Sequence, residues 1–105
     1  MTSGVKRYRV ELSPEALEQA QAIRTWWLEN RATAPDLFVD ELGAALRKLG
    51  TVPRTGARYE AMTSREMRRV LMPRTRYHLY YTVDDDSRLV RVHAIWHTSR
   101  ERGPR

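Results

Sequence analysis

Apolar and polar residues alternate along residues 68–97, and this pattern predicts three short β-strands. Val, Leu, Ile, Tyr and Trp dominate the runs at 68–72, 76–83 and 88–97, while Pro and a cluster of Asp mark turns at 73–75 and 84–87. Because successive side chains of a strand point to opposite faces, one face of the last strand is expected to carry Val90, Val92, Ala94 and Trp96. The opposite face is then expected to carry Arg91, His93, Ile95 and His97, joined by His78, Tyr80 and Thr82 of the middle strand. This second, basic face is the place where we look for function.

The N-terminal half predicts one strand followed by two helices. Residues 5–12 alternate as a half-buried strand, and Ser13 and Pro14 then suit the N-cap and the first position of a helix. Its apolar stripe is expected to be Leu17, Ala20, Ile23 and Trp27. A second helix should begin with Thr33 as its cap and Pro35 in its first turn, and should end with Gly50 as a left-handed C-cap. Because the break between the two helices is short, they should form an antiparallel hairpin.

The order strand, helix, helix, strand, strand, strand predicts an α+β fold of two layers. We expect the antiparallel helical hairpin to pack on one face of a mostly antiparallel four-stranded sheet and to leave the basic face partly open. A length of 105 residues predicts a single domain over residues 1–105. Residues 51–66 form the least regular connection, and residues 98–105 are expected to be a flexible tail because none of them is large and apolar.

The formal net charge of +6 is unevenly distributed, with −2 over residues 1–46 and +8 over residues 47–105. This asymmetry indicates an anionic partner, either nucleic acid or an acidic protein segment, although a solvated basic surface has the same composition. The absence of cysteine excludes disulfides and thiolate metal sites. No apolar run has the length of a signal peptide or a membrane span, so a cytoplasmic protein without a membrane partner is expected.

Four segments in this order resemble the RelE/ParE superfamily of toxins from bacterial type II toxin–antitoxin modules, and together they cover roughly residues 5–100. The segments are SPEALEQAQAIRTWWLEN, DLFVDELGAALRKLGTVPRTG, RRVLMPRTRYHLYYTVD and VRVHAIWHTSR. Three features look most like the ParE and plasmid-stabilisation side of the superfamily: the P-x-x-G from Pro53 to Gly56, the paired arginines that open the hairpin, and the W-H-x-x-R ending.

The resemblance implies a small basic toxin that forms a hetero-oligomer with a cognate acidic antitoxin, whose partly disordered segment folds on the toxin. The ParE branch is known for inhibiting DNA gyrase without hydrolytic chemistry of its own, and this is the expected function. The alternative is the RelE branch, which cuts mRNA in the ribosome without a metal. A further alternative, from another class, is a non-toxic basic module that only binds nucleic acid. No cofactor is expected under any of these.

Candidate site residues follow from these alternatives. If the protein is a nuclease, His97 would transfer protons while Arg69 and Arg100 hold the phosphate. As a surface that binds nucleic acid or another target, the expected set is Arg54, Arg58, Arg69, Tyr80, Arg91, His97 and Arg100, with Tyr80 stacking on a splayed base.

Each candidate also has an ordinary structural interpretation. His97 at a strand end can cap neighbouring carbonyls, and His78 and His93 can be half-buried sheet residues. Strand alternation allows only one of the two arginines at the hairpin start to reach the open face, which we expect to be Arg69, while Arg68 either lies at the margin of that face or satisfies the loop. No metal site is expected, because no carboxylate accompanies the histidines in their strands.

Overall fold

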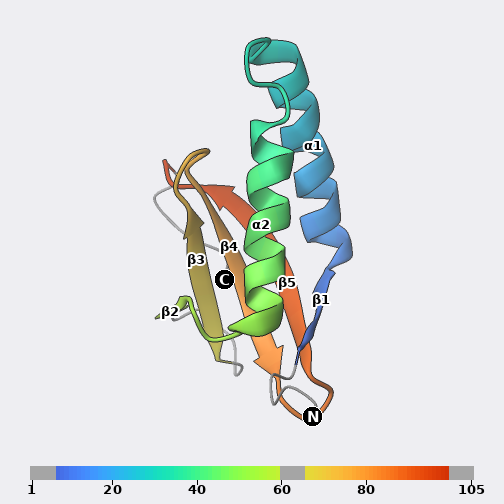
Figure 1. Ribbon diagram of the computed structural model, residues 1–105, viewed down its shortest axis with the longest axis vertical. Helices are drawn as coiled ribbons and strands as arrows, with labels where there is room; N and C mark the ends of the chain where they lie inside the picture. Colours follow the sequence, from blue (N-terminus) through green and yellow to red (C-terminus); the bar gives the residue numbers. More distant parts are fainter. Residues whose placement is uncertain (1–6, 60–65, 100–105) are drawn as a thin grey trace, which may run out of the picture.

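The computed structural model describes residues 7–59 and 66–99, and it contains two helices packed on a five-stranded sheet (Figure 1). The strand order is β1-β5-β4-β3-β2, with β1 parallel to β5 and every other neighbouring pair antiparallel. The elements are β1 (Arg9–Leu12), α1 (Pro14–Asn30), α2 (Leu37–Thr51), β2 (Ala57–Tyr59), β3 (Met67–Met72), β4 (Tyr77–Asp84) and β5 (Leu89–His97). The two-layer α+β fold is therefore confirmed.

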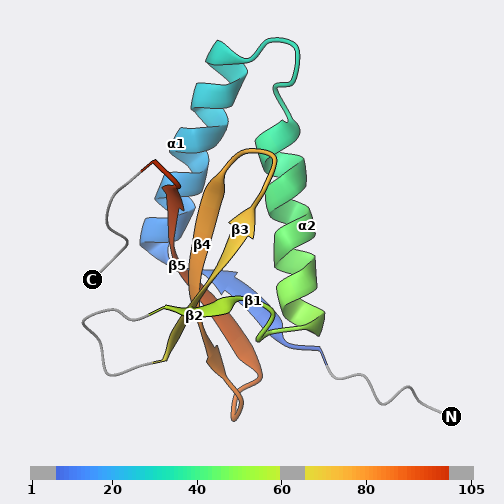
Figure 2. The same cartoon turned by 90° about the vertical axis from the view of Figure 1, so that its left-hand side faces the viewer.

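The sheet has one strand more than the four that were predicted. Strand β2 forms within the connection expected to be irregular, and it pairs with β3 at the edge of the sheet (Figure 2). It has three residues, too few for alternation to be visible in the sequence. The expected tail at 98–105 lies outside the described residues from position 100 onward.

Helix α1 begins as the sequence predicts. The Ser13 hydroxyl accepts a hydrogen bond from the backbone N–H of Ala16 at 3.1 Å, and Pro14 occupies the first helical position. This cap satisfies one of the backbone donors that every helix leaves unpaired at its start. The predicted apolar stripe is wrong in one position, since Leu17 is 46% exposed and Ala16 takes its place in the core.

Helix α2 begins later than predicted and ends differently. Its N-cap is Asp36, which makes no side-chain cap bond, so the expected start at Thr33 and Pro35 is wrong. Gly50 lies inside the helix rather than in a left-handed cap. Its small size serves packing instead, because a Cβ there would lie 3.2 Å from the Tyr8 carbonyl oxygen, and the Gly50 carbonyl accepts the Tyr8 N–H at 2.8 Å.

An irregularity in the pairing of β4 with β5 reverses the predicted alternation of the last strand. Tyr81 pairs with Val92 and Tyr80 pairs with Ala94, which leaves His93 as an extra residue in a β-bulge. Beyond the bulge, Ile95 turns into the core, where it is 2% exposed, while Trp96 lies on the opposite face. The expectation that Trp96 joins the core and Ile95 leaves it is therefore wrong.

The core lies between the helices and one face of the sheet. It joins residues of both helices with inward-facing residues of β3, β4 and β5: Ala16, Ala20, Trp27, Phe38, Leu42, Leu49, Met72, Leu79, Tyr81, Val90, Val92 and Ile95. Neither helix is long and apolar enough to cross a membrane, over the ranges 7–59 and 66–99.

Candidate functional site

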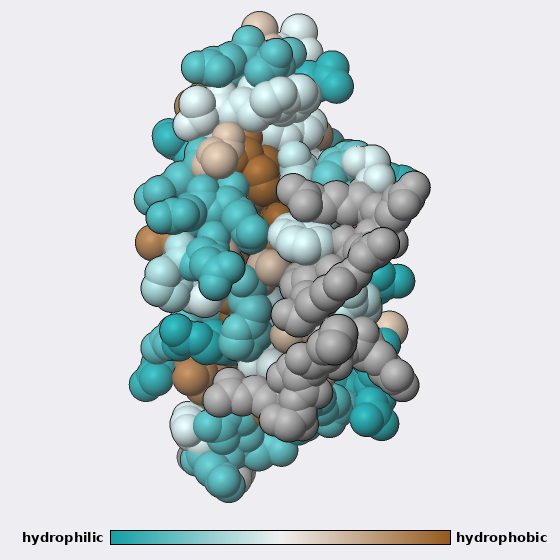
Figure 3. Space-filling view, turned by 180° about the vertical axis from the view of Figure 1, so that it is seen from behind, coloured by the Kyte–Doolittle hydropathy of each residue, from teal (hydrophilic) through white to brown (hydrophobic). Residues whose placement is uncertain are grey.

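The sheet face turned away from the core is the candidate site, and we call it the open face. Cross-strand partners share a face of a sheet, so the register places Arg69, Tyr80 and Ala94 together across β3, β4 and β5. The further members are Tyr59 of β2, Leu71 of β3, His78 and Thr82 of β4, and Arg91, His93 and Trp96 of β5. Figure 3 shows the molecule from behind, and where described residues are visible on that side, hydrophilic ones predominate around a narrow vertical band of apolar ones.

Aromatic rings stack edge to face in the middle of the open face. The Tyr80 ring lies 4.9 Å from the Tyr59 ring, 5.9 Å from the His78 ring and 6.3 Å from the Trp96 ring, centroid to centroid. Tyr80 is only 3% exposed. The expectation that Tyr80 stacks on a nucleic-acid base is therefore wrong, because its ring is already covered. Tyr59, which the sequence analysis missed, is the ring that covers it from the sheet edge.

Arg69 lies above this aromatic cluster. Its guanidinium carbon is 5.4 Å from the centroid of the Tyr59 ring, the distance of a cation–π contact. It is exposed, and none of the ion pairs among the described residues includes it. Arg69 is thus a cation held on an aromatic support, with its charge available to a partner. Burial lowers the pKa of the nearby His78 imidazole, and the charge of Arg69 adds to this effect.

Arg91 is on the open face, but its charge is shared. Its guanidinium nitrogen lies 3.3 Å from a Glu11 carboxylate oxygen, and the same carboxylate contacts Arg9 at 3.4 Å. On the neighbouring strand, the Thr82 hydroxyl and the His93 Nε2 are 2.8 Å apart. The part of the face next to β1 is therefore a hydrogen-bonded polar region rather than a free basic patch.

Arg54 was expected on the basic face, but it instead joins the α2–β2 connection to the β4–β5 turn. Its two terminal nitrogens bond both oxygens of Asp85 at 3.1 and 2.9 Å, and the Tyr8 hydroxyl donates to the same carboxylate at 2.6 Å. The bond from Arg54 lowers the pKa of Asp85 most, and the bond from Tyr8 lowers it further. The hydrogen bond between Tyr8 and Asp85 also raises the pKa of the Tyr8 phenol. Arg54 thus stabilises the fold.

Arg58 and Arg68 pair across the sheet edge on the face opposite to Arg69. Arg58 is largely exposed and lies 3.5 Å from Glu66. Arg68 donates to the Gly56 carbonyl at 2.8 Å and to Glu66 at 2.9 Å. It therefore bonds the loop, which was one of the two expectations for this residue. The expected single basic surface containing Arg54, Arg58 and Arg69 is therefore not assembled.

The P-x-x-G motif has a packing reason. The Gly56 N–H donates to the hydroxyl of the buried Tyr81 at 2.9 Å, which brings the loop backbone against β3. A Cβ at Gly56 would lie 2.5 Å from the Arg69 carbonyl oxygen and 2.7 Å from the Tyr81 hydroxyl. Glycine is thus the residue that fits where the loop enters β2, beside the arginine of the open face.

His97 lies on the helix-facing side of the sheet, away from Arg69. It is the cross-strand partner of Tyr77, whose ring packs on the core residue Phe38, and the His97 and Tyr77 rings are 5.0 Å apart. The His97 Nδ1 accepts the backbone N–H of Ser99 at 3.1 Å, and the Ser99 hydroxyl is 2.9 Å from the same nitrogen. In the neutral ring this places the proton on Nε2.

The expected nuclease set of His97, Arg69 and Arg100 is therefore not brought together within the described residues. The bulge at His93 changes the phase of β5, so His97 lies on the opposite face from Arg69. Arg100 lies outside the described residues. Nothing in the sequence signalled the bulge, whose extra residue is anchored by a bond from the Ser13 hydroxyl to the His93 carbonyl at 3.2 Å. Within residues 7–59 and 66–99, no group of three or more metal-ligating side chains is found.

The fold agrees with that of several solved toxin chains. The RelBE2 toxin–antitoxin complex of Mycobacterium tuberculosis matches with a TM-score of 0.61 at 17% identity, covering 94% of this chain and 100% of that chain. The chromosomal ParDE system of Pseudomonas aeruginosa matches with a TM-score of 0.65 at 13% identity, covering 87% and 96%. The RelBE complex of Escherichia coli matches with a TM-score of 0.58 at 19% identity, covering 89% and 99%. The class defined by the fold is thus the one that these RelBE and ParDE chains share.

The sequence narrows this class to one family. The model of the ParE toxin of the type II toxin–antitoxin system parDE matches residues 10–102. This chain belongs to that family. No curated protein matches the sequence at a significant level.

Proposed function

We propose that this toxin inhibits growth by binding DNA gyrase through its open face, without hydrolytic chemistry. The observation that carries the proposal is the separation of Arg69 from His97. The exposed cation lies on an aromatic support on one face, and the imidazole at the end of β5 lies on the other. RNA cleavage without a metal needs a proton-transferring group beside the phosphate-binding cation. Membership of the ParE family supports the same choice.

The neutralising partner is a cognate acidic antitoxin that covers the open face. The solved chains with this fold include toxin–antitoxin complexes, which supports a hetero-oligomer here as well. An acidic segment would meet Arg69 above a surface of partly exposed Tyr59, Trp96 and Leu71. Aromatic and arginine side chains of this kind are those that contribute most at protein interfaces. Because the gyrase and the antitoxin would use the same surface, binding of one would exclude the other.

Growth arrest after expression of the toxin alone tests the proposal. We expect His97→Ala to arrest growth like the parent chain and to induce the SOS response, because the imidazole has no chemical role. Arg69→Glu should lose the arrest, because it reverses the charge on the open face. Folding of both variants is checked by circular dichroism.

The RelE-like alternative gives a different result in the same cells. A ribosome-dependent nuclease would deplete mRNA without SOS induction, and His97→Ala would abolish its toxicity. Either observation would overturn the gyrase proposal and favour mRNA cleavage.

A further inference from the structure

The turn between β3 and β4, residues 73–76, carries two arginines outside the internal ion-pair network. Arg74 and Arg76 are both exposed. The ion pairs recorded over residues 7–59 and 66–99 involve other arginines, among them Arg54 and Arg91, and neither Arg74 nor Arg76 takes part in one. Their guanidinium groups are therefore available to an external anion.

The backbone of this turn is held in place by a carboxylate from α2. One oxygen of Glu41 accepts the Arg74 N–H at 2.7 Å. The other accepts the Thr75 N–H at 2.9 Å and the Thr75 hydroxyl at 2.6 Å, and Thr75 is 4% exposed. Glu41 is thus engaged by the turn rather than by a guanidinium. A turn fixed in this way loses little backbone freedom on binding, so the backbone that carries the two cations is preorganised.

Arg76 has a left-handed backbone, with φ of 70°. This conformation suits glycine or asparagine and is disfavoured for a residue with a longer side chain. The turn needs the conformation, because the Arg76 N–H bonds the Met72 carbonyl at 2.8 Å and the Arg76 carbonyl accepts the Thr98 N–H at 2.9 Å. A glycine would make both backbone bonds, so the arginine side chain needs another reason. Arg88 is also left-handed, but its turn contains three aspartates and has no comparable positive field.

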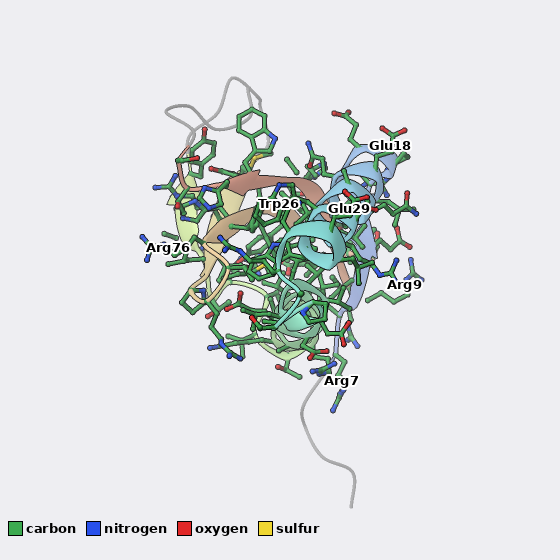
Figure 4. All side chains as sticks on the ribbon, turned by 90° about the horizontal axis from the view of Figure 1, so that it is seen from above. Arg7, Arg9, Glu18, Trp26, Glu29 and Arg76 are labelled. Carbon is green, nitrogen blue, oxygen red and sulfur yellow. The ribbon has the colours of Figure 1, made fainter. Side chains whose placement is uncertain are left out.

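We propose that this turn is a nucleic-acid contact in which Arg74 and Arg76 hold the phosphate backbone. The guanidinium fork matches a phosphate group in two hydrogen bonds, and two arginines separated by one residue can reach neighbouring phosphates. The turn lies at one end of the sheet (Figure 1). Viewed from above, Arg76 is on the opposite side of the molecule from Glu18 and Glu29 of α1 (Figure 4).

A phosphate backbone fits the turn better than a protein surface does. Thr75 is buried, so a partner meets two guanidinium groups and the Pro73 ring, without the large apolar or aromatic anchor that protein interfaces need. The contact is distinct from the open face and does not depend on gyrase as the target. It would add sequence-independent affinity for nucleic acid.

Fluorescence anisotropy of the full-length chain tests the contact, with a duplex DNA of about 20 base pairs and a single-stranded RNA of about 20 nucleotides, between about 0.05 and 0.2 M salt. The double variant Arg74→Ala/Arg76→Ala removes two phosphate contacts. The slope of log K against log salt should therefore fall in magnitude by about 1.8 on duplex DNA or about 1.4 on the single strand. At 0.1 M salt this corresponds to about a 60-fold or about a 25-fold loss of affinity. The nucleic acid on which the slope falls by its own expected value identifies the source of the phosphate.

The matched control is Arg24→Ala/Arg47→Ala, which removes the same charge from exposed positions on the two helices. It should change the slope little. A third variant, Arg76→Gly, should keep or raise the melting temperature while weakening binding, which separates recognition from folding. Equal slopes for the two double variants would overturn the proposal. So would a turn variant that loses affinity for a polyglutamate peptide but not for nucleic acid, since the partner would then be an acidic protein.

Discussion

Gly56 shows how one residue links the loop to the open face. Its missing side chain lets the loop approach the backbone of β3 beside Arg69, where a methyl group would lie 2.5 Å from a carbonyl oxygen. The same closeness allows the Gly56 N–H to reach the buried Tyr81 hydroxyl. The position of the aromatic cluster at the sheet edge therefore depends on a glycine far from any chemistry.

Gly56→Ala should lower the free energy of unfolding by roughly 2–4 kcal/mol, because the clash is with backbone rather than with a flexible side chain. Gly43→Ala is the matched control. Gly43 lies inside α2 and a Cβ there would meet only an Arg47 nitrogen at 3.4 Å, so this change should stabilise by about 0.5–1 kcal/mol. Urea denaturation measures both. A tolerated alanine at Gly56 would contradict the tight packing of the loop.

Asp85 gives a pH dependence with a definite sign. Its bonds from Arg54 and Tyr8 lower its pKa in the folded state below the ordinary value of 3.8. A depressed folded-state pKa adds stability that is present above pH about 4 and is lost as the pH falls through the folded value. Asp85→Asn should thus be less stable than the parent chain at pH 7, and the difference should disappear in acid. Asp86→Asn, which removes the same charge one residue later without breaking these two bonds, is the matched control and should keep nearly the stability of the parent chain at pH 7.

At the scale of elements, the sequence predicted most of what periodicity and caps can show. The Ser13-Pro14 start of α1, the helical hairpin and the three antiparallel strands β3, β4 and β5 were all predicted correctly. Strand β2 is too short to show a period, and Gly50 was misread because a glycine near a helix end can serve packing as well as capping. The bulge at His93 was invisible, since alternation is counted residue by residue and one extra residue reverses every later assignment. That reversal also explains why the candidate site was only partly foreseen.

The phase reversal of β5 can be tested directly. Ile95→Asn places an unpaired amide in the core and should lower the free energy of unfolding by roughly 3 kcal/mol or more. Leu71→Asn on the open face should cost about 1 kcal/mol or less, because Leu71 is 40% exposed. Thermal denaturation of the two variants compares them. An equal loss of stability in the two variants would mean that Ile95 lies outside the core, as the predicted alternation of β5 without a bulge requires.

At the scale of the whole molecule, two sets of the described arginines differ in their pairing. Those near the β4–β5 turn and the edge of β1 are paired with carboxylates and support the fold. Those on the open face and the β3–β4 turn, namely Arg69, Arg74 and Arg76, lie outside these pairs, and in our two proposals they provide the charge that a partner meets. The net charge of +6 therefore does not show which cations are unpaired or where they lie.

Inhibition of DNA supercoiling by purified gyrase tests the central claim most directly. The parent chain and His97→Ala should inhibit at similar concentrations, because the proposed interaction needs no proton transfer. Arg69→Glu should require at least tenfold more protein, the equivalent of about 1.4 kcal/mol of lost binding. If the parent chain leaves gyrase unaffected, or if Arg69→Glu inhibits as well as the parent chain does, the open face is not the surface that binds gyrase and the account is contradicted.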